Sequence, residues 1–266
     1  MKKEKIVNII FYVALGLIII ILLIAVINKF TGLNSETPIV KDAYALLGDE
    51  QLEYCDGLPY YADNEVNYDT LSDKTKKCLA FRYAKDKVTA DKLDKTKKTD
   101  YCYLDKAKKV GFRTNDAKES CDIQIITKED LNNAYIAIFG KNIEEYTDFA
   151  INGSQSCYFN EEKGSYTCGN VITQTLEIGW NPTTYRMIYK IKEKDNQLII
   201  YDYYLNVNNE KCFLTNNGTK ENEKCSDKFT SETKVNGKFV SKYGKKYIHT
   251  FEKENGSYHW VSSIAK

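Results

Sequence analysis

The feature that most constrains this chain is an uninterrupted apolar run from Ile6 to Ile27, IVNIIFYVALGLIIIILLIAVI. It has 22 residues, no charged side chain and one strongly polar one, Asn8. At a helical rise of about 1.5 Å per residue the run extends roughly 33 Å, enough for a bilayer core of about 30 Å. A buried core helix or the apolar part of a signal peptide needs fewer residues. The pattern therefore predicts a transmembrane helix over residues 6–27.

The basic residues around this run predict its orientation. Three lysines precede it and one follows closely: Lys2, Lys3, Lys5 and then Lys29. The positive-inside rule then makes residues 1–5 a cytoplasmic tail and places the rest of the chain outside the cell. The sequence after Ile27 lacks the small residues of a signal-peptidase site, which favours an uncleaved signal-anchor. We expect a single-pass cell-membrane protein with residues 28–40 as a linker and an extracellular C-terminal part.

All of the cysteines lie beyond the apolar run, and there are 8 of them. An even number confined to the non-cytoplasmic side indicates disulfide bonds. Hairpin geometry predicts Cys157–Cys168 and Cys212–Cys225, after which Cys55–Cys78 and Cys102–Cys121 pair locally. The chain has no cysteine pair at the spacing of a zinc site, no redox motif, and no loop typical of phosphate or calcium binding. We therefore expect neither a metal nor a cofactor.

Charge is strongly polarised in the first part of the extracellular region. Residues 36–73 carry ten acidic side chains and one lysine, a net charge of −9, whereas residues 74–109 have a net charge of +8. The two segments are either solvated faces that neutralise each other or a binding surface for anionic wall polymers or lipid headgroups. The lysines that we expect to form such a surface are Lys95, Lys97, Lys98, Lys106, Lys108 and Lys109.

Residues 41–126 are predicted to be mostly helical. Asp42–Leu47 form a short helix ended by Gly48, and Ser72 caps a helix over residues 72–85. The polar stretch 86–100 fits a connector or an exposed helix. Residues 101–109 give a weak helical pattern.

The clearest local pattern is TKEDLNNAYIAIFG, residues 127–140, which starts the predicted α+β domain 127–266. Thr127 and Asp130 resemble a capping box, and Gly140 suits the left-handed residue that ends a helix. Five apolar side chains recur at helical spacing and should form one buried stripe: Leu131, Ala134, Tyr135, Ile138 and Phe139. This helix needs a surface to cover, which the strands after residue 154 supply as an antiparallel sheet.

Four hairpins are expected in that sheet. Cys157 faces Cys168 in the first, a Lys-Asp-Asn turn joins the runs of 184–207, and 211–225 resembles the first hairpin. The last hairpin turns at Asn255-Gly256, which opposes Phe251 to Trp260. On the face of that pair we place Tyr247, His249, Tyr258 and Ile264. The opposite face places Glu252 across from His259.

The helix TKEDLNNAYIAIFG and the ending KKYIHTFEKENGSYHWVSS resemble uncharacterised single-pass envelope proteins of low-GC Gram-positive bacteria. The resemblance implies an ectodomain in which a helix is cupped by a curved antiparallel sheet, similar to the cystatin or NTF2-like arrangement. It covers roughly the second half of the chain and brings no catalytic motif. It therefore implies architecture and location, with no catalytic residue.

The histidines do not by themselves predict a reaction. His249 stands among aromatic residues, where a satisfied buried imidazole is the default. His259 and Glu252 form either an acid/base pair or an ordinary cross-strand polar pair. No serine or thiol is placed beside a histidine by sequence spacing.

Two further patterns leave alternatives open. The tyrosines of an acidic loop, Tyr54, Tyr60, Tyr61 and Tyr68, either stack on a sugar or partner protein or fill the core. Asn152, Asn217 and Asn255 each begin a glycosylation sequon, but Asn-Gly is also what tight turns require.

We expect a non-catalytic extracytoplasmic binding or scaffold module that engages an envelope polymer or a protein partner, with no nucleic acid. One alternative is an envelope hydrolase whose acidic residues are distant in sequence. Another is a regulatory subunit whose anchor docks on a membrane protein.

Overall fold

A computed structural model describes residues 33–47, 55, 65–94, 101–105, 110–113, 120–151, 155–171, 183–214 and 220–266. The predicted transmembrane run 6–27 lies outside these residues. Among the described helices, none has the length and apolar character needed to cross a membrane.

The chain folds into an α+β structure with antiparallel sheets, which confirms the expected class. Its helices are α2 (Pro38–Ala45), α3 (Asp73–Tyr83), the 3-10 turn η1 (Lys85–Lys87), α4 (Lys128–Phe139), α5 (Glu223–Ser226) and α6 (Gly237–Tyr243). The early strands are β1 (Val66–Asn67), β2 (Thr89–Asp94), β3 (Tyr101–Asp105), β4 (Val110–Arg113), β5 (Ser120–Thr127), β6 (Phe149–Ala150), β7 (Gln155–Asn160) and β8 (Ser165–Asn170). The later strands are β9 (Thr183–Lys194), β10 (Gln197–Asn208), β11 (Lys211–Phe213), β12 (Lys245–Glu254) and β13 (Ser257–Ala265).

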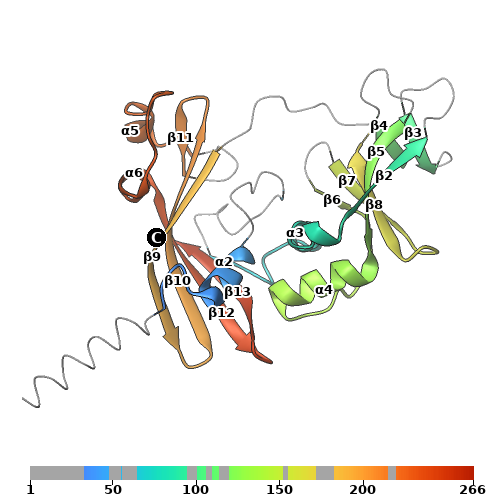
Figure 1. The fold of residues 1–266 in the computed structure, drawn as a ribbon, viewed down its shortest axis with the longest axis horizontal. Coiled ribbons are helices and arrows are strands. Elements are labelled where there is room, and N and C mark those ends of the chain that lie inside the picture. The colour runs from blue at the N-terminus through green and yellow to red at the C-terminus, as the bar shows by residue number, and fades with distance from the viewer. Residues whose placement is uncertain are drawn as a thin grey trace, which may run out of the picture.

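The strands form two principal sheets, with helices α3 and α4 between them (Figure 1). The large sheet has the order β1-β13-β12-β10-β11, and β9 also pairs with β10. The small sheet has the order β2-β5-β8-β7-β6, and β3 pairs with β4 in a separate hairpin. The expectation of one sheet after residue 154 is therefore wrong. Strand β8 pairs with β5, whose alternating buried side chains the sequence analysis did not assign to a strand.

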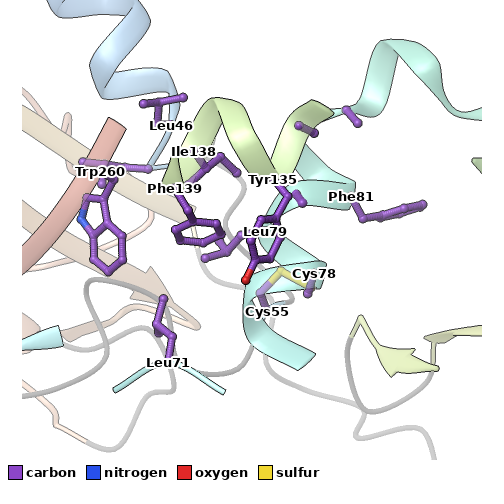
Figure 2. Close-up of a cluster of buried hydrophobic side chains, with 14 of the residues drawn as sticks. Leu46, Cys55, Leu71, Cys78, Leu79, Phe81, Tyr135, Ile138, Phe139 and Trp260 are labelled. Carbon is purple, nitrogen blue, oxygen red and sulfur yellow. A yellow bond between two sulfur atoms is a disulfide. The ribbon is translucent and has the colours of Figure 1, made fainter. Parts of the chain in front are cut away.

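The hydrophobic core is shared by elements of both sheets. Helices α2, α3 and α4 meet strand β13 in one buried cluster (Figure 2). The ring of Phe139 on α4 lies edge-on to Trp260 on β13, with 6.0 Å between the ring centroids. The two sheets are thus joined through α4.

Helix α4 matches its predicted pattern closely. Thr127 Oγ1 accepts a hydrogen bond from the backbone N–H of Asp130 at 3.0 Å, and all five residues of the predicted stripe are buried. Gly140 has φ +67°, and a Cβ there would lie 3.3 Å from the ring of His259. A left-handed backbone and a close neighbour both favour glycine at this position.

The region 41–126 is not mostly helical. Helix α3 is present, and Ser72 caps it as expected. Helix α2 begins at Pro38 and ends at Ala45, so the expected start at Asp42 and the expected linker end at residue 40 are wrong, because proline suits the first turn of a helix. Residues 89–94 and 101–105, however, are strands where a connector and a helix were expected. Strand β2 has mostly exposed side chains, so backbone pairing with β5 defines it rather than apolar periodicity. Strand β5 ends at Thr127, so the small sheet also crosses the predicted domain boundary at 126/127.

The structure contains four disulfides: Cys55–Cys78, Cys102–Cys121, Cys157–Cys168 and Cys212–Cys225. These are the four pairs named from the sequence. Only the Cys157–Cys168 disulfide joins two paired strands, because Cys157 on β7 lies directly opposite Cys168 on β8. Cys225 lies on α5 rather than on a strand, because Asn222 accepts from its backbone N–H and starts a short helix.

The last hairpin has the predicted pairs Phe251–Trp260 and Glu252–His259, but one predicted position is wrong. The register shifts between Thr250 and Phe251, so that His249 faces Ser263. The extra residue on β13 turns Ile264 away from the inner face and brings Ser263 onto it.

Candidate functional site

Strand β10 has side chains on both faces of the large sheet, a buried inner face and a partly exposed outer face. Side chains alternate along a strand, and those of Leu198, Ile200, Asp202 and Tyr204 are fully buried. Between them, Ile199, Tyr201 and Tyr203 are only partly buried. The two faces therefore offer different chemistry and are considered in turn.

Part of the outer face is covered by the C-terminal helices. Leu205 and Val207 of β10 pack in a second hydrophobic cluster with Val240 of α6 and the Cys212–Cys225 disulfide. The part of the sheet nearer to the β9–β10 turn extends beyond that cluster, and Tyr203 lies at the border, packed against it. Its side chains come from β9, β10 and β12.

A bulge in β9 shapes this open part. Tyr201 pairs with Lys190, whereas Asp202 pairs with Ile188, so Tyr189 is the extra residue. Bulges re-aim side chains. Tyr189 is 41% exposed, and its ring lies 4.6 Å from that of Tyr203 and 6.1 Å from that of Tyr201.

Lysines surround these rings. The ammonium groups of Lys190 and Lys192 lie 5.5 and 5.9 Å from the centroid of the Tyr201 ring. Lys246 on β12 lies 5.6 Å from the centroid of the Tyr203 ring. We define the tyrosine–lysine face as Tyr189, Tyr201, Tyr203, Lys190, Lys192 and Lys246.

The charge of this face is positive at neutral pH. Burial raises the pKa of the Tyr189 phenol, and its neighbours Tyr203, Asp202 and Tyr201 raise it further, so this ring stays protonated and neutral. The three lysines have exposed side chains. Glu252, which strand alternation puts on the same side of the sheet, accepts a hydrogen bond from Gln197 at 3.1 Å. The tyrosine rings and the exposed lysine ammonium groups thus alternate across this face.

The inner face holds a buried chain of hydrogen bonds. His249 Nδ1 lies 2.6 Å from Ser263 Oγ, and His249 Nε2 lies 3.1 Å from Asp202 Oδ1. Trp260 Nε1–H donates to Ser263 Oγ at 2.9 Å, and the Tyr44 hydroxyl donates to Asp202 Oδ2. All of these groups are satisfied when the Ser263 hydroxyl donates to His249 Nδ1 and His249 Nε2–H donates to the Asp202 carboxylate.

These residue types are those of a Ser-His-Asp hydrolase, but their setting does not suit that chemistry. Asp202, His249 and Ser263 are each 0% exposed, and a nucleophile must reach its substrate. The serine oxygen also accepts from an indole. The arrangement accounts for a buried carboxylate whose oxygens are both hydrogen-bonded.

Sequence reasoning missed Ser263 and Asp202 as partners of His249. The β13 bulge places Ser263 inward, and bulges have no dependable sequence signature. Asp202 was hidden in an aromatic run, although an acidic residue at an inward position of a buried strand was the available signal.

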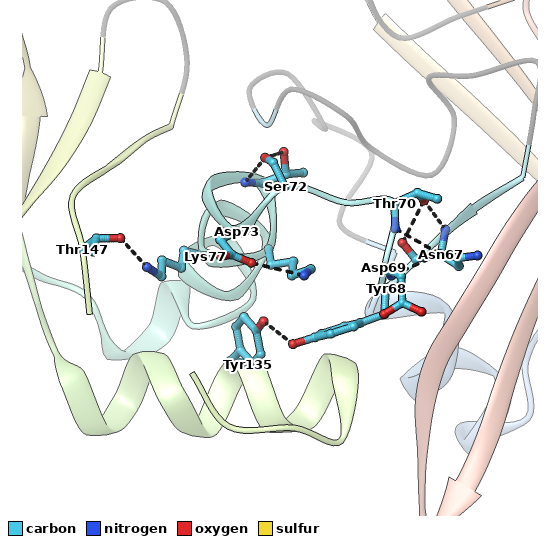
Figure 3. Close-up of polar contacts among 11 residues, drawn as sticks. Asn67, Tyr68, Asp69, Thr70, Ser72, Asp73, Lys77, Tyr135 and Thr147 are labelled. Atoms are coloured by element: carbon cyan, nitrogen blue, oxygen red, sulfur yellow. Dashed lines mark hydrogen bonds and ion pairs between the residues drawn. The ribbon is translucent and has the colours of Figure 1, made fainter. Parts of the chain in front are cut away.

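The other predicted site residues have different outcomes. The six lysines expected to form an anionic-surface site lie outside the described residues, as do Tyr54, Tyr60 and Tyr61 and the sequons at Asn152 and Asn217. Asn255 forms the hairpin turn with φ 50°. Tyr68 packs against the core, and its hydroxyl is 2.9 Å from that of Tyr135 (Figure 3). Figure 3 also shows the hydrogen bond from Lys77 on α3 to Thr147 in the loop after α4.

His259 and Glu252 face each other on neighbouring strands as predicted, but they form an ordinary cross-strand pair rather than an acid/base pair. His259 Nδ1 donates to the backbone carbonyl of Ala137 at 3.0 Å. Across the described residues, no cluster of three or more histidine, cysteine, aspartate or glutamate side chains is arranged to hold a metal.

Comparisons with family models, curated proteins and solved structures gave no match. The resemblance to envelope proteins and to cystatin or NTF2-like folds therefore stays a prediction.

Proposed function

We propose that this protein is a non-catalytic binding module of the cell envelope, and that its tyrosine–lysine face holds an anionic polymer that carries sugar rings. The observation that carries the proposal is the interleaving of three tyrosine rings with three exposed lysines on one open sheet face.

The chemistry of the face supports this ligand class. Tyrosine rings present apolar surface with a polar edge, which suits the face of a sugar ring. Lysine supplies a compact point charge on a flexible stem, which suits charges spaced along a chain rather than one buried anion. An open sheet face also suits an extended polymer better than a small molecule, because small ligands bind in concave pockets.

The location is part of the proposal. Four disulfides fit an extracytoplasmic domain, because disulfides persist in oxidising compartments. We propose that residues 6–27 form the uncleaved anchor, with the N-terminus in the cytoplasm. A polymer of the envelope would then be within reach of the anchored domain.

The test is a binding titration with the full-length protein in nanodiscs of neutral lipid. The probe is a fluorescent, glucosylated poly(glycerol phosphate), with neutral dextran, a single-stranded oligonucleotide and anionic vesicles as competitors. We expect binding at about 0.1 M salt and much weaker binding at about 1 M, because the Debye length shrinks from roughly 10 to 3 Å.

Replacing Lys190, Lys192 and Lys246 with alanine should weaken binding about a hundredfold, since each lysine near an anionic surface contributes roughly 1 kcal/mol. A matched triple variant at the exposed lysines Lys74, Lys87 and Lys163 keeps the same net charge. It should bind like the wild type. Equal losses in both triples would reject the face as the site, and preference for vesicles or for the oligonucleotide would reject the polymer as its ligand.

A further inference from the structure

Strand β10 connects the tyrosine–lysine face to the buried side of the sheet within three residues. Tyr201 and Tyr203 point outward, and Asp202 between them points inward. The β9 bulge that presents Tyr189 also occurs at this point, between the pairs of Tyr201 and Asp202. The position of Asp202 therefore affects all three rings of the face.

Asp202 is held from two other elements. Helix α2 supplies the Tyr44 hydroxyl to one carboxylate oxygen, and β12 supplies His249 Nε2 to the other at 3.1 Å. The side chain is 0% exposed, so water does not replace either donor without local opening. Both bonds restrain β10 at the residue opposite the bulge.

Tyr44 also contacts the strands on either side of β10. The guanidinium carbon of Arg186 on β9 lies 4.5 Å from the centroid of its ring, and the His249 ring meets it edge-on at 6.4 Å. Pro38, the first residue of α2, follows Ile27 by eleven positions. Tyr44 thus connects helix α2, the described helix nearest in sequence to the apolar run, to strands β9, β10 and β12.

We propose that Asp202 is a positioning residue for the tyrosine–lysine face, and that through Tyr44 it couples ligand binding on that face to the docking of helix α2. This inference rests on the proposed function for its ligand, but the coupling itself is a property of the unliganded protein. Because coupling between two sites is reciprocal, a ligand on the face should tighten α2, and loosening α2 should weaken the ligand.

The test compares Tyr44→Phe with Tyr258→Phe in the full-length protein. The Tyr258 hydroxyl donates to Glu193 on β9 at 2.8 Å, so the control removes a similar hydroxyl–carboxylate bond from the strand next to β10 without touching Asp202. The first readout is amide hydrogen exchange without ligand, for peptides that cover α2, the β9 bulge and the β7–β8 hairpin.

In Tyr44→Phe we expect about tenfold faster exchange in α2 and at residues 188–190, the fold-change typical of losing one charge-assisted hydrogen bond. The β7–β8 hairpin should exchange at the wild-type rate, and Tyr258→Phe should leave α2 unchanged. The second readout is affinity for the glucosylated poly(glycerol phosphate), which Tyr44→Phe should weaken about threefold to tenfold.

Unchanged exchange at the bulge in Tyr44→Phe overturns the inference, while binding by the wild type would leave the proposed function standing. Faster exchange with unchanged affinity overturns the coupling. If the wild type does not bind the polymer at all, the proposed function fails, and the exchange data alone decide whether Tyr44 and Asp202 position the face.

Discussion

The small and large sheets are stabilised by different kinds of interaction. Three of the four disulfides lie in or beside the small-sheet half: Cys55–Cys78 on α3, Cys102–Cys121 between β3 and β5, and Cys157–Cys168 across β7 and β8. The large sheet has one, Cys212–Cys225, at its covered end. In its centre the large sheet instead has a buried series of hydrogen bonds that connects Asp202, His249 and Ser263.

The difference follows from strand length. Strands β7 and β8 have six residues each, whereas β9 and β10 have twelve each. Long strands bury many aromatic side chains and can accommodate a satisfied polar chain. Short strands bury less, and a covalent bond compensates by restricting the unfolded chain.

The largest expected effect comes from breaking the polar chain of the large sheet. Asp202→Ala removes the buried carboxylate that accepts hydrogen bonds from Tyr44 and His249, and we expect a loss of about 3–5 kcal/mol in the free energy of unfolding. Urea denaturation measures it. The control is Glu252→Ala, an exposed carboxylate on the same sheet, which should change stability by about 0.5 kcal/mol or less. If Asp202→Ala loses no more unfolding free energy than Glu252→Ala, the buried hydrogen bonds of Asp202 do not stabilise the protein.

Removing the Cys157–Cys168 disulfide should be the next largest change. The double alanine variant should lose about 3 kcal/mol, because the closed loop of 11 residues no longer restricts the unfolded state. Hydrogen exchange should show the loss in β7 and β8 and much less in β12 and β13. Equal loosening of both sheets would mean that they unfold as one unit and would remove the distinction drawn above.

Ser263→Ala should have a moderate effect. It removes the acceptor for the Trp260 indole N–H and the donor to His249 Nδ1, which should cost about 1–3 kcal/mol. Ser262→Ala is the matched control, since Ser262 pairs with Thr250 on the opposite face. If both variants unfold at the same urea concentration, Ser263 does not contribute through these bonds.

The smallest expected effect is the pH dependence from Lys77 on α3. Burial lowers the pKa of its ammonium from 10.5, although Asp73, Glu145 and Asp148 oppose the shift. Between the lowered folded value and 10.5 the unfolded chain holds the extra proton, so stability should rise with pH in that window. Relative to Lys77→Met, urea titrations at about pH 8 and about pH 10 should show this rise, at most about 1.4 kcal/mol per pH unit, because the tyrosines whose pKa burial raises lower the stability of both proteins equally. Lys77→Met should lack it, and an identical rise in the variant would contradict the assignment.

Local patterns could be predicted from the sequence, and pairing between distant segments could not. The α4 stripe, its cap at Thr127 and the Phe251–Trp260 register depend on neighbours within a few residues. The division into two sheets depends on β5 meeting β8, some forty residues later, where turn chemistry gives no information. Strand β2 was missed because its side chains are mostly exposed and polar.

The candidate site was harder to predict for a related reason. Tyr189 and Ser263 face as they do because of two bulges, and each bulge reverses the alternation from which a side chain's direction is inferred. The residues Tyr189, Lys190 and Lys192 were visible as a tyrosine- and lysine-rich strand. Their gathering with Tyr203 and Lys246 required the register of three strands.

The bulge in β13 also determines how this chain responds to a change in its gene. An in-frame deletion of the codon for Val261 would remove the extra residue, so that Ser262 would still face Thr250 and Ser263 would still face His249. A single lost codon here would thus give β13 a regular alternation and keep the Ser263 hydroxyl on the inner face with His249 and Trp260. A lost codon at His259, between the turn and Trp260, would instead turn Trp260 outward, so the harm done by a deletion in β13 depends on whether it falls at the bulge.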